Sequence, residues 1–252
     1  MLEVIILSIV QGITEFLPVS SSSHLILVSK FFSFNNESLT LDVSLHLGSL
    51  LAIIFYFRKD LLNFINNRVL FLKILISSIP VIIFGFLLIK LQLLDYLRNY
   101  KVIGWATIVF GVLLYLSDLI KVKKKFNGNF KFSTSLYIGL FQVLSLIPGV
   151  SRSGITITAA RLFKFNRVDS AKISFLISIP ILSAASLYNI KNLFITSSYQ
   201  ISLINILGVL FSFVCSYLTI KYFLYYISKF SLTVFVIYRI FLGSIILIYS
   251  YL

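Results

Sequence analysis

Two short stretches of this chain combine carboxylate, hydroxyl, imidazole and guanidinium groups that could bind or transfer a phosphoryl group. Residues 11–24 read QGITEFLPVSSSSH, and residues 142–154 read QVLSLIPGVSRSG. Gln11 and Glu15 are four residues apart, so on a helix their side chains would share one face and could hold a cation. Arg152 offers a planar fork of donors that matches phosphate oxygens. These groups predict a site for a phosphorylated compound.

A proline followed by small polar residues interrupts each stretch. Pro18 and Pro148 lack an N–H group and disfavour helix in the preceding residue, so one helix should end there and another should begin from the serines that follow. The free N–H groups at a helix start attract anions. A cap and a hinge, or a structural Glu-Arg pair, would explain the same residues more simply. The phosphate-binding interpretation assigns that role to Ser20, Ser22, Ser151, Arg152, Ser153, Gly154 and Thr156.

The composition places these polar groups inside a membrane protein. Hydrophobic residues make up 59% of the 252 residues, charged residues 12%, and the mean hydropathy is +1.01, which excludes an ordinary soluble domain. The net charge of +14 comes from short basic clusters between apolar stretches, so no nucleic-acid partner is expected. Because an ionisable group at membrane depth is costly unless it is paired or hydrated, Glu15, His24 and Arg152 are candidate functional residues.

The apolar stretches predict both membrane spans and hairpins. Two apolar regions, 2–33 and 133–163, are broken by the prolines, and neither half of either region could span alone. Non-helical backbone at membrane depth must be buried in protein or line a wet cavity, so both regions are predicted to be re-entrant hairpins that line the site. Six other stretches are long enough, or nearly so, to cross as helices: 41–57, 69–91, 102–120, 171–190, 200–226 and 231–251.

The two hairpins begin an internal repeat. Pro18 and Pro148 are 130 positions apart, and the same offset nearly superimposes the first three spans on the last three. Because a hairpin returns to its own side and three spans end on the opposite side, the second half must enter the membrane inverted. The predicted fold is an all-α polytopic membrane protein with an inverted-topology repeat, each half a re-entrant helical hairpin plus three transmembrane helices. The single membrane domain, 1–252, would comprise a first half, a basic cytoplasmic linker and a second half, at 1–120, 121–132 and 133–252.

The basic residues orient this topology. Fourteen Lys and Arg residues fall on the face that holds the loops after the first, third and fifth spans, and five fall on the other face: Lys30, Lys90, Arg98, Lys101 and Lys191. The positive-inside rule makes the first face cytoplasmic. Both termini and the first hairpin would then lie on the outer side, and the second hairpin would enter from the cytoplasm.

The motifs carry a family resemblance. The segments QGITEFLPVSSSSH and IPGVSRSGITI resemble the two signature motifs of the bacterial undecaprenyl-diphosphate phosphatase family of the bacitracin-resistance type. The similarity continues in DVSLHLGSLLAIIFYFRKDL and SAKISFLISIP, so it covers both halves. It implies hydrolysis of undecaprenyl diphosphate to undecaprenyl phosphate and inorganic phosphate, which recycles the lipid carrier for cell-wall synthesis and gives bacitracin resistance. It also implies an inverted-repeat fold in the cytoplasmic (inner) membrane, a site at the outer face, and a divalent cation, Mg²⁺ or Ca²⁺.

The resemblance also implies roles for individual residues. By motif position, the acidic pair of the family, expected to bind the cation, falls on Gln11 and Glu15, and the phosphate-binding arginine on Arg152. The proposed nucleophilic serine falls on Ser21 and the histidine on His24. Either Ser21 or a water would attack the terminal phosphorus, while His24 would exchange protons with the nucleophile or leaving phosphate.

Two positions depart from the family pattern. Gln11 stands where the family often has Glu, so a cation site would lose one charge and depend more on Glu15. Ser22 and Ser23 replace the usual Thr-Gly before the histidine, which costs backbone freedom in the loop.

Other readings of the polar residues remain open. A transporter or flippase of an anionic polyprenyl phosphate lipid could use the same fold, the arginine and the helix ends, but it has less use for a Glu-Ser-His cluster. Asp42 and His46 are read as a hydrogen-bonded pair beside the site rather than as zinc ligands. Lys221 and Arg239, near span ends, are expected to snorkel to the membrane surface. The expected partners are the membrane and a polyprenyl diphosphate lipid, and the sequence leaves a homodimer open.

Overall fold

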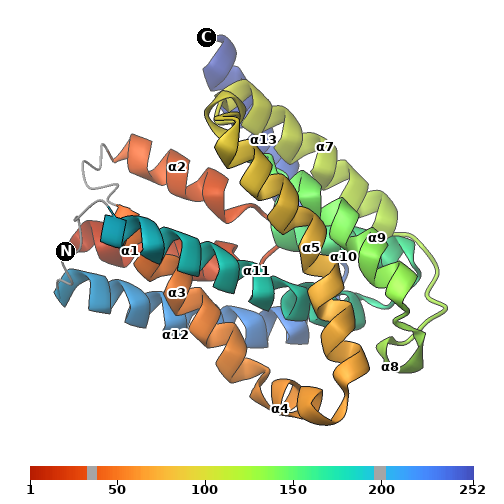
Figure 1. Ribbon diagram of the computed structural model, residues 1–252. Coiled ribbons are helices and arrows are strands. Elements are labelled where there is room, and N and C mark those ends of the chain that lie inside the picture. The colour runs from red at the N-terminus through yellow and green to blue at the C-terminus, as the bar shows by residue number, and fades with distance from the viewer. Residues whose placement is uncertain (33–38, 196–202) are drawn as a thin grey trace.

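The computed structural model describes residues 1–32, 39–195 and 203–252 (Figure 1). Within them, the only element that is not helical is an isolated bridge between Lys124 and Phe165. The prediction of an all-α fold is therefore confirmed. The helices are α1 (Leu2–Thr14), α2 (Ser21–Phe31), α3 (Leu39–Tyr56), α4 (Arg58–Asn66), α5 (Arg68–Lys90), α6 (Leu94–Leu97), α7 (Tyr100–Asp118), α8 (Phe126–Asn129), α9 (Phe132–Val143), the 3-10 turn η1 (Leu144–Leu146), α10 (Arg152–Leu162), α11 (Arg167–Ile195), α12 (Leu203–Lys229) and α13 (Thr233–Tyr251).

Five helices are long and apolar enough to cross a membrane, and they match five of the predicted spans. The helix that matches the first predicted span, α3, has a shorter apolar part, Thr40–Tyr56. Large apolar side chains such as Phe86 on α5 and Phe241 on α13 are exposed, as expected for surfaces that face lipid tails. The chain is therefore a multi-pass membrane protein. Its five long spans are Arg68–Lys90, Tyr100–Asp118, Arg167–Asn192, Leu203–Lys229 and Thr233–Tyr251.

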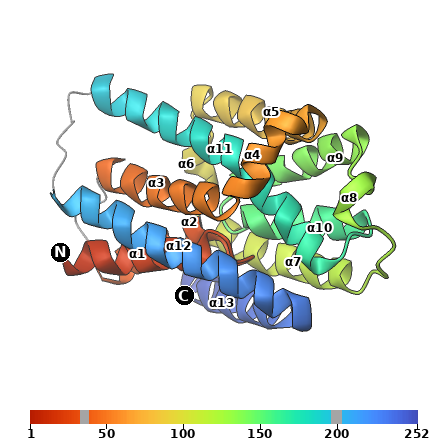
Figure 2. The ribbon, with the colours of Figure 1, turned by 90° about the horizontal axis from the view of Figure 1, so that it is seen from below.

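Helices that are far apart in the sequence pack side by side. The helix α12 contacts both α1 and α3, and Figures 1 and 2 show these three as one group of neighbours. The helix α9 packs against α5, and α13 packs against α7. The first helix of each hairpin, α1 or α9, thus contacts the middle span of the other half, α12 or α5. Such reciprocal contacts are expected between two related halves. The inverted relation of the halves stays a prediction.

Small residues allow the hairpins to approach these spans. A Cβ atom at Gly12 of α1 would clash with Cys215 of α12, and one at Gly139 of α9 would clash with the backbone carbonyl of Ser77 in α5. Membrane helices associate through such close backbone contacts because burial of apolar surface gains little in lipid. The glycines therefore let each hairpin lie directly against a span.

Phe16 fixes the turn of the first hairpin. Its ring is fully buried and packs edge-on against Phe175 of α11, with the ring centroids 5.4 Å apart and the planes at 89°. Phe57 of α3 contacts the same Phe175 ring at 6.2 Å. Aromatic rings favour this edge-to-face arrangement. Because Glu15 immediately precedes Phe16, the packing of this ring also fixes the carboxylate that the sequence singles out.

Arg161 connects the last turn of α10 to neighbouring loops through hydrogen bonds. Its side chain is 2% exposed and donates from Nη1 to the carbonyl of Phe165 at 2.6 Å. From Nη2 it donates to the carbonyls of Asp118 and Ile120, each at 2.8 Å. The Asp118 carboxylate is paired with Arg167 at 2.7 Å. These contacts join the end of α7 to the turn between α10 and α11.

Candidate active site

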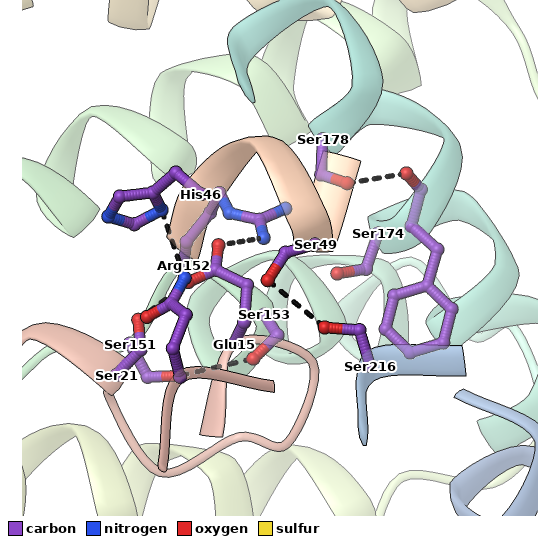
Figure 3. A network of polar contacts seen from close by, with 12 residues as sticks. Glu15, Ser21, His46, Ser49, Ser151, Arg152, Ser153, Ser174, Ser178 and Ser216 are labelled. Atoms are coloured by element: carbon purple, nitrogen blue, oxygen red, sulfur yellow. Dashed lines mark hydrogen bonds and ion pairs between the residues drawn. The ribbon is translucent and has the colours of Figure 1, made fainter. Parts of the chain in front are cut away.

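The tips of the two hairpins meet through an ion pair. Glu15, at the end of α1, accepts a hydrogen bond on Oε1 from Nη2 of Arg152, the first residue of α10, at 2.7 Å (Figure 3). The two side chains are 6% and 13% exposed. Ser153 adds a second connection because its hydroxyl donates to the Leu17 carbonyl at 2.7 Å. The predicted convergence of the two motifs is present in the structure.

The second oxygen of Glu15 faces a hydroxyl and an amide. Ser21 donates from Oγ to Glu15 Oε2 at 2.7 Å, and Gln11 donates from Nε2 to the same oxygen at 3.0 Å. A carboxylate that accepts a serine hydroxyl can also accept its proton when the serine attacks an electrophile. The pair therefore has the geometry of a nucleophile with its base.

The two breaks share an unusual backbone. Ser20 precedes α2 with φ 75°, and Ser151 precedes α10 with φ 69°. Residues other than glycine rarely adopt positive φ, and such strain is concentrated at functional sites. Both serines therefore turn the chain sharply, so that α2 begins at Ser21 and α10 begins at Arg152. The starts of the two helices consequently lie close together, because Ser21 and Arg152 both contact Glu15.

Two polar atoms beside the ion pair have no protein partner. Nη1 of Arg152 is buried without a hydrogen bond, and so is Oε1 of Gln11. An unpaired buried donor or acceptor costs free energy, so each is expected to meet a ligand or water. Nη1 can take a phosphate oxygen while Nη2 stays on Glu15.

The remaining predicted phosphate-binding residues have different surroundings. Ser151 accepts the N–H of Gly154 at 3.1 Å and lies 3.2 Å from the hydroxyl of Ser153. Ser20 lies 3.4 Å from the hydroxyl of the exposed Ser22. These residues surround the helix starts. Thr156 is instead buried against α11, where its hydroxyl lies 2.6 Å from that of Ser174, and its contact with phosphate stays a prediction.

His24 contacts Tyr238, a residue for which the sequence predicted no role in the site. Its Nδ1 lies 2.7 Å from the carbonyl of Ser20, so Nδ1 carries the proton and Nε2 accepts the hydroxyl of Tyr238 at 2.6 Å. The two rings are stacked with centroids 5.7 Å apart. Tyr238 of α13 therefore orients the imidazole. A tyrosine within an apolar span gives no local signal for such a role.

His46 of α3 also belongs to the site. Nε2 of Gln11 lies 2.9 Å from Nδ1 of His46 and also donates to Glu15. The amide can satisfy both neighbours only with its nitrogen toward the carboxylate, so Nδ1 is the acceptor. Asp42 lies 3.7 Å from Nε2 of His46, which is beyond hydrogen-bonding distance. The predicted hydrogen bond between Asp42 and His46 is therefore absent from the structure, and the closer partner of His46 is Gln11.

The oxygen atoms of this site fit a cation that is held jointly by the protein and the substrate phosphates. They fit a cation held by protein ligands alone less well. Among the residues that the structure describes, no group of three or more His, Cys, Asp or Glu side chains could hold a metal. Glu15 and the unpartnered Oε1 of Gln11 are nevertheless oxygen ligands of the kind that Mg²⁺ and Ca²⁺ prefer. Mg²⁺ in particular often takes only one or two carboxylates together with substrate phosphates.

The prediction that Arg239 extends to the membrane surface is wrong. Its side chain is fully buried and donates to Pro18 and Gly149, at the tips of the two hairpins, instead of extending to the membrane surface. Burying an arginine within an apolar span is costly, so its presence at position 239 could have indicated a role in the site.

Comparisons with known proteins identify the family of this chain. The family model for bacitracin resistance protein BacA matches residues 4–245. A Pelagibacter ubique protein named undecaprenyl-diphosphatase is 55% identical over 251 residues, covering 99% of this chain and 98% of the relative. Relatives of the same name from Campylobacter curvus and Saccharophagus degradans are 43% and 42% identical, with 97% and 96% of each chain covered. The chain therefore belongs to the bacitracin resistance protein BacA family.

Proposed function

We propose that this chain hydrolyses undecaprenyl diphosphate to undecaprenyl phosphate and inorganic phosphate. The observation that carries the proposal is the Glu15 carboxylate, which contacts the hydroxyl of Ser21 and the guanidinium of Arg152 at 2.7 Å each. A phosphatase needs a nucleophile, a base and a cationic clamp within reach of one phosphorus atom. The name undecaprenyl-diphosphatase of the relatives supports the choice of substrate.

Ser21 attacks the terminal phosphorus. Its Oγ forms a bond to phosphorus while its proton passes to Glu15, and the bond to the bridging oxygen breaks to release undecaprenyl phosphate. Nη1 of Arg152 and the N–H groups at the helix starts hold the phosphoryl oxygens as charge moves to the leaving group. As Arg152 engages these oxygens, Glu15 loses part of the positive charge that stabilises its carboxylate and accepts the proton more readily.

Water completes the reaction by hydrolysing the phosphoserine. The proton of this water passes to Nε2 of His24 through the hydroxyl of Tyr238, which that nitrogen accepts. Glu15 returns its proton to Oγ of Ser21 as the bond from Oγ to phosphorus breaks. The reaction returns Ser21 as a free hydroxyl and releases inorganic phosphate.

A divalent cation that enters with the diphosphate would be held by Glu15 and by Oε1 of Gln11. When bound, it supplies positive charge that neutralises the diphosphate oxygens. The two protein ligands carry a single negative charge between them. We therefore expect weak binding of the cation in the absence of substrate.

The enzyme acts in the bacterial cytoplasmic membrane, with its site open to the outer side. The distribution of Lys and Arg residues between the loops supports this orientation through the positive-inside rule. The product would return to the lipid carrier pool for peptidoglycan synthesis, and continued recycling would give resistance to bacitracin.

The direct test measures phosphate release from undecaprenyl or farnesyl diphosphate by purified protein in detergent, with Mg²⁺, with Ca²⁺ and with a chelator. Ser21→Ala and Arg152→Lys should each lower kcat by at least about 10²-fold, since each removes a group that acts in the transition state. Ser228→Ala is the control because that hydroxyl only donates to the Tyr225 carbonyl on α12. It should keep wild-type activity.

The outcomes separate the competing functions and nucleophiles. A labelled phosphoserine trapped at residue 21 by acid quench would identify Ser21 as the nucleophile. An active Ser21→Ala enzyme would instead assign the attack to water. Folded wild-type protein that releases no phosphate, but moves undecaprenyl phosphate across sealed proteoliposomes, would replace the phosphatase with a transporter.

A further inference from the structure

Arg239 is a buried cation that touches both hairpin tips. It lies on α13, and its side chain is fully shielded from solvent. Nη1 donates to the carbonyl of Pro18 at 3.1 Å, and Nη2 donates to the carbonyl of Gly149 at 2.9 Å. Nε donates to the carbonyl of Thr107 in α7 at 3.1 Å. The three nitrogens of one rigid fork thus join a span to the break of each hairpin.

The neighbouring residues leave space for this guanidinium. A Cβ atom at Gly154 would lie 2.8 Å from Nη1 of Arg239, and one at Gly111 would lie 3.2 Å from its Cβ. Gly154 follows Arg152 by two residues in the first turn of α10. The two arginines therefore approach the same helix start from different elements, Arg152 as part of α10 and Arg239 from α13.

In the described part of the chain, no carboxylate is paired with the positive charge of Arg239. Among the residues that the structure describes, Glu15, Asp60 and Asp118 form ion pairs with other Lys and Arg side chains, and no ion pair includes Arg239. Glu15 is already paired with Arg152. A buried charge without an ionic partner is costly, and such groups gather where an anion binds.

We propose that Arg239 is a positioning residue that holds the two hairpin tips at one separation and adds uncompensated positive charge for the diphosphate. If the tips moved apart, Glu15 and Ser21 of one hairpin would lose their alignment with Arg152 of the other. The inference rests on the proposed phosphatase function. It adds a second residue of α13, after Tyr238, to a site otherwise built from the hairpins and α3.

Two substitutions separate geometry from charge. Arg239→Lys keeps the charge but replaces the planar fork by one compact ammonium, which cannot serve three separated carbonyls in the same way. It should lower kcat by about 10²-fold, the factor expected for a misplacement of about 1 Å, with little change in KM. Arg239→Met removes the charge as well, and should also raise KM about tenfold, since a charge near the site attracts the diphosphate through a medium of low dielectric constant.

Arg161 provides the matched control. It is also buried and also donates to three backbone carbonyls, and its Nε lies 3.4 Å from the Asp118 carboxylate. It lies nine residues after Arg152, about 13 Å along α10. Arg161→Lys and Arg161→Met should lower the thermal unfolding temperature without changing kcat or KM of the folded enzyme. A fluorescence-monitored melt would determine the folded fraction of every variant.

A second readout does not depend on catalysis. Inorganic pyrophosphate should raise the unfolding temperature of the wild type and of the Arg161→Met variant, and should raise that of Arg239→Met much less. Wild-type kcat in folded Arg239→Lys, or an equal loss of kcat in Arg161→Lys, would overturn the positioning role. Equal stabilisation of Arg239→Met and the wild type by pyrophosphate would overturn the charge role. A wild type that binds pyrophosphate but releases no phosphate from the lipid would contradict the proposed function alone.

Discussion

Replacing Glu15 by Gln tests the central claim that the carboxylate acts as a base and not as a ligand for substrate. The amide is nearly the same size, and its oxygen can still accept the bond from Arg152 Nη2. Its nitrogen must then face the hydroxyl of Ser21 and the amide of Gln11, which now donate to Glu15 Oε2. Ser21 would lose its proton acceptor while the hairpin tips stay together.

The magnitude follows from the two contacts that change. Loss of a positioned base lowers the rate by about 10² to 10⁴-fold, which corresponds to about 3 to 5 kcal/mol in the activation barrier. Arg152 would no longer share its charge with a carboxylate, so its attraction for the diphosphate should increase. We therefore expect kcat to fall by at least about 10²-fold and KM to stay the same or decrease.

The assay is steady-state phosphate release from farnesyl diphosphate, with rates divided by the concentration of folded enzyme. Asp60→Asn is the control, because this carboxylate pairs with Lys172 at 2.6 Å outside the site and both side chains are about one third exposed. Such a pair contributes at most about 1 kcal/mol, so its loss should leave kcat unchanged. A Glu15→Gln enzyme with normal kcat and a raised KM would refute the role of Glu15 as a base.

Three further changes test other parts of the site. Tyr238→Phe removes the hydroxyl that contacts His24 and should lower kcat about tenfold, whereas an unchanged pH profile and kcat would show that the ring needs no such partner. Gln11→Glu places a second carboxylate one turn before Glu15 and should lower the Mg²⁺ concentration needed for half-maximal phosphate release; a higher requirement would contradict the cation assignment. Gly139→Leu would push α9 away from α5 and should cost about 1 to 3 kcal/mol of stability, measurable as a lower unfolding temperature; an unchanged temperature would show that the helices can separate without cost.

Much of the site could be predicted because its chemistry is concentrated in two motifs. An acidic residue and an arginine are both costly in an apolar background, and proline marks where each helix must break. Those signals indicated Glu15 and Arg152, whose ion pair was the simpler explanation considered for them. Ser21, which contacts Glu15, was indicated only by its position in the family motif. The helix positions follow from apolar length, which is a strong signal in membrane proteins.

The contributions of other helices could not be predicted in the same way. Tyr238 and Arg239 lie more than 200 residues from the first hairpin, and no periodic pattern indicates which atoms they reach. Arg239 was placed at the membrane surface because arginines near span ends commonly snorkel, yet three backbone carbonyls hold it inside. The contact of His46 with Gln11 likewise depends on how α3 packs beside α1. These contacts arise from tertiary packing and have no local signature.

The separation of the site residues along the chain has a consequence for biogenesis. Glu15 leaves the ribosome 137 residues before Arg152, and Pro18 leaves it 221 residues before Arg239. During synthesis the first hairpin therefore has a carboxylate but no cationic partner, and burying it at membrane depth would be costly. The hairpin is expected to settle to its final depth only after α10 arrives. The active site is completed last, when α13 inserts and Arg239 reaches Pro18 and Gly149.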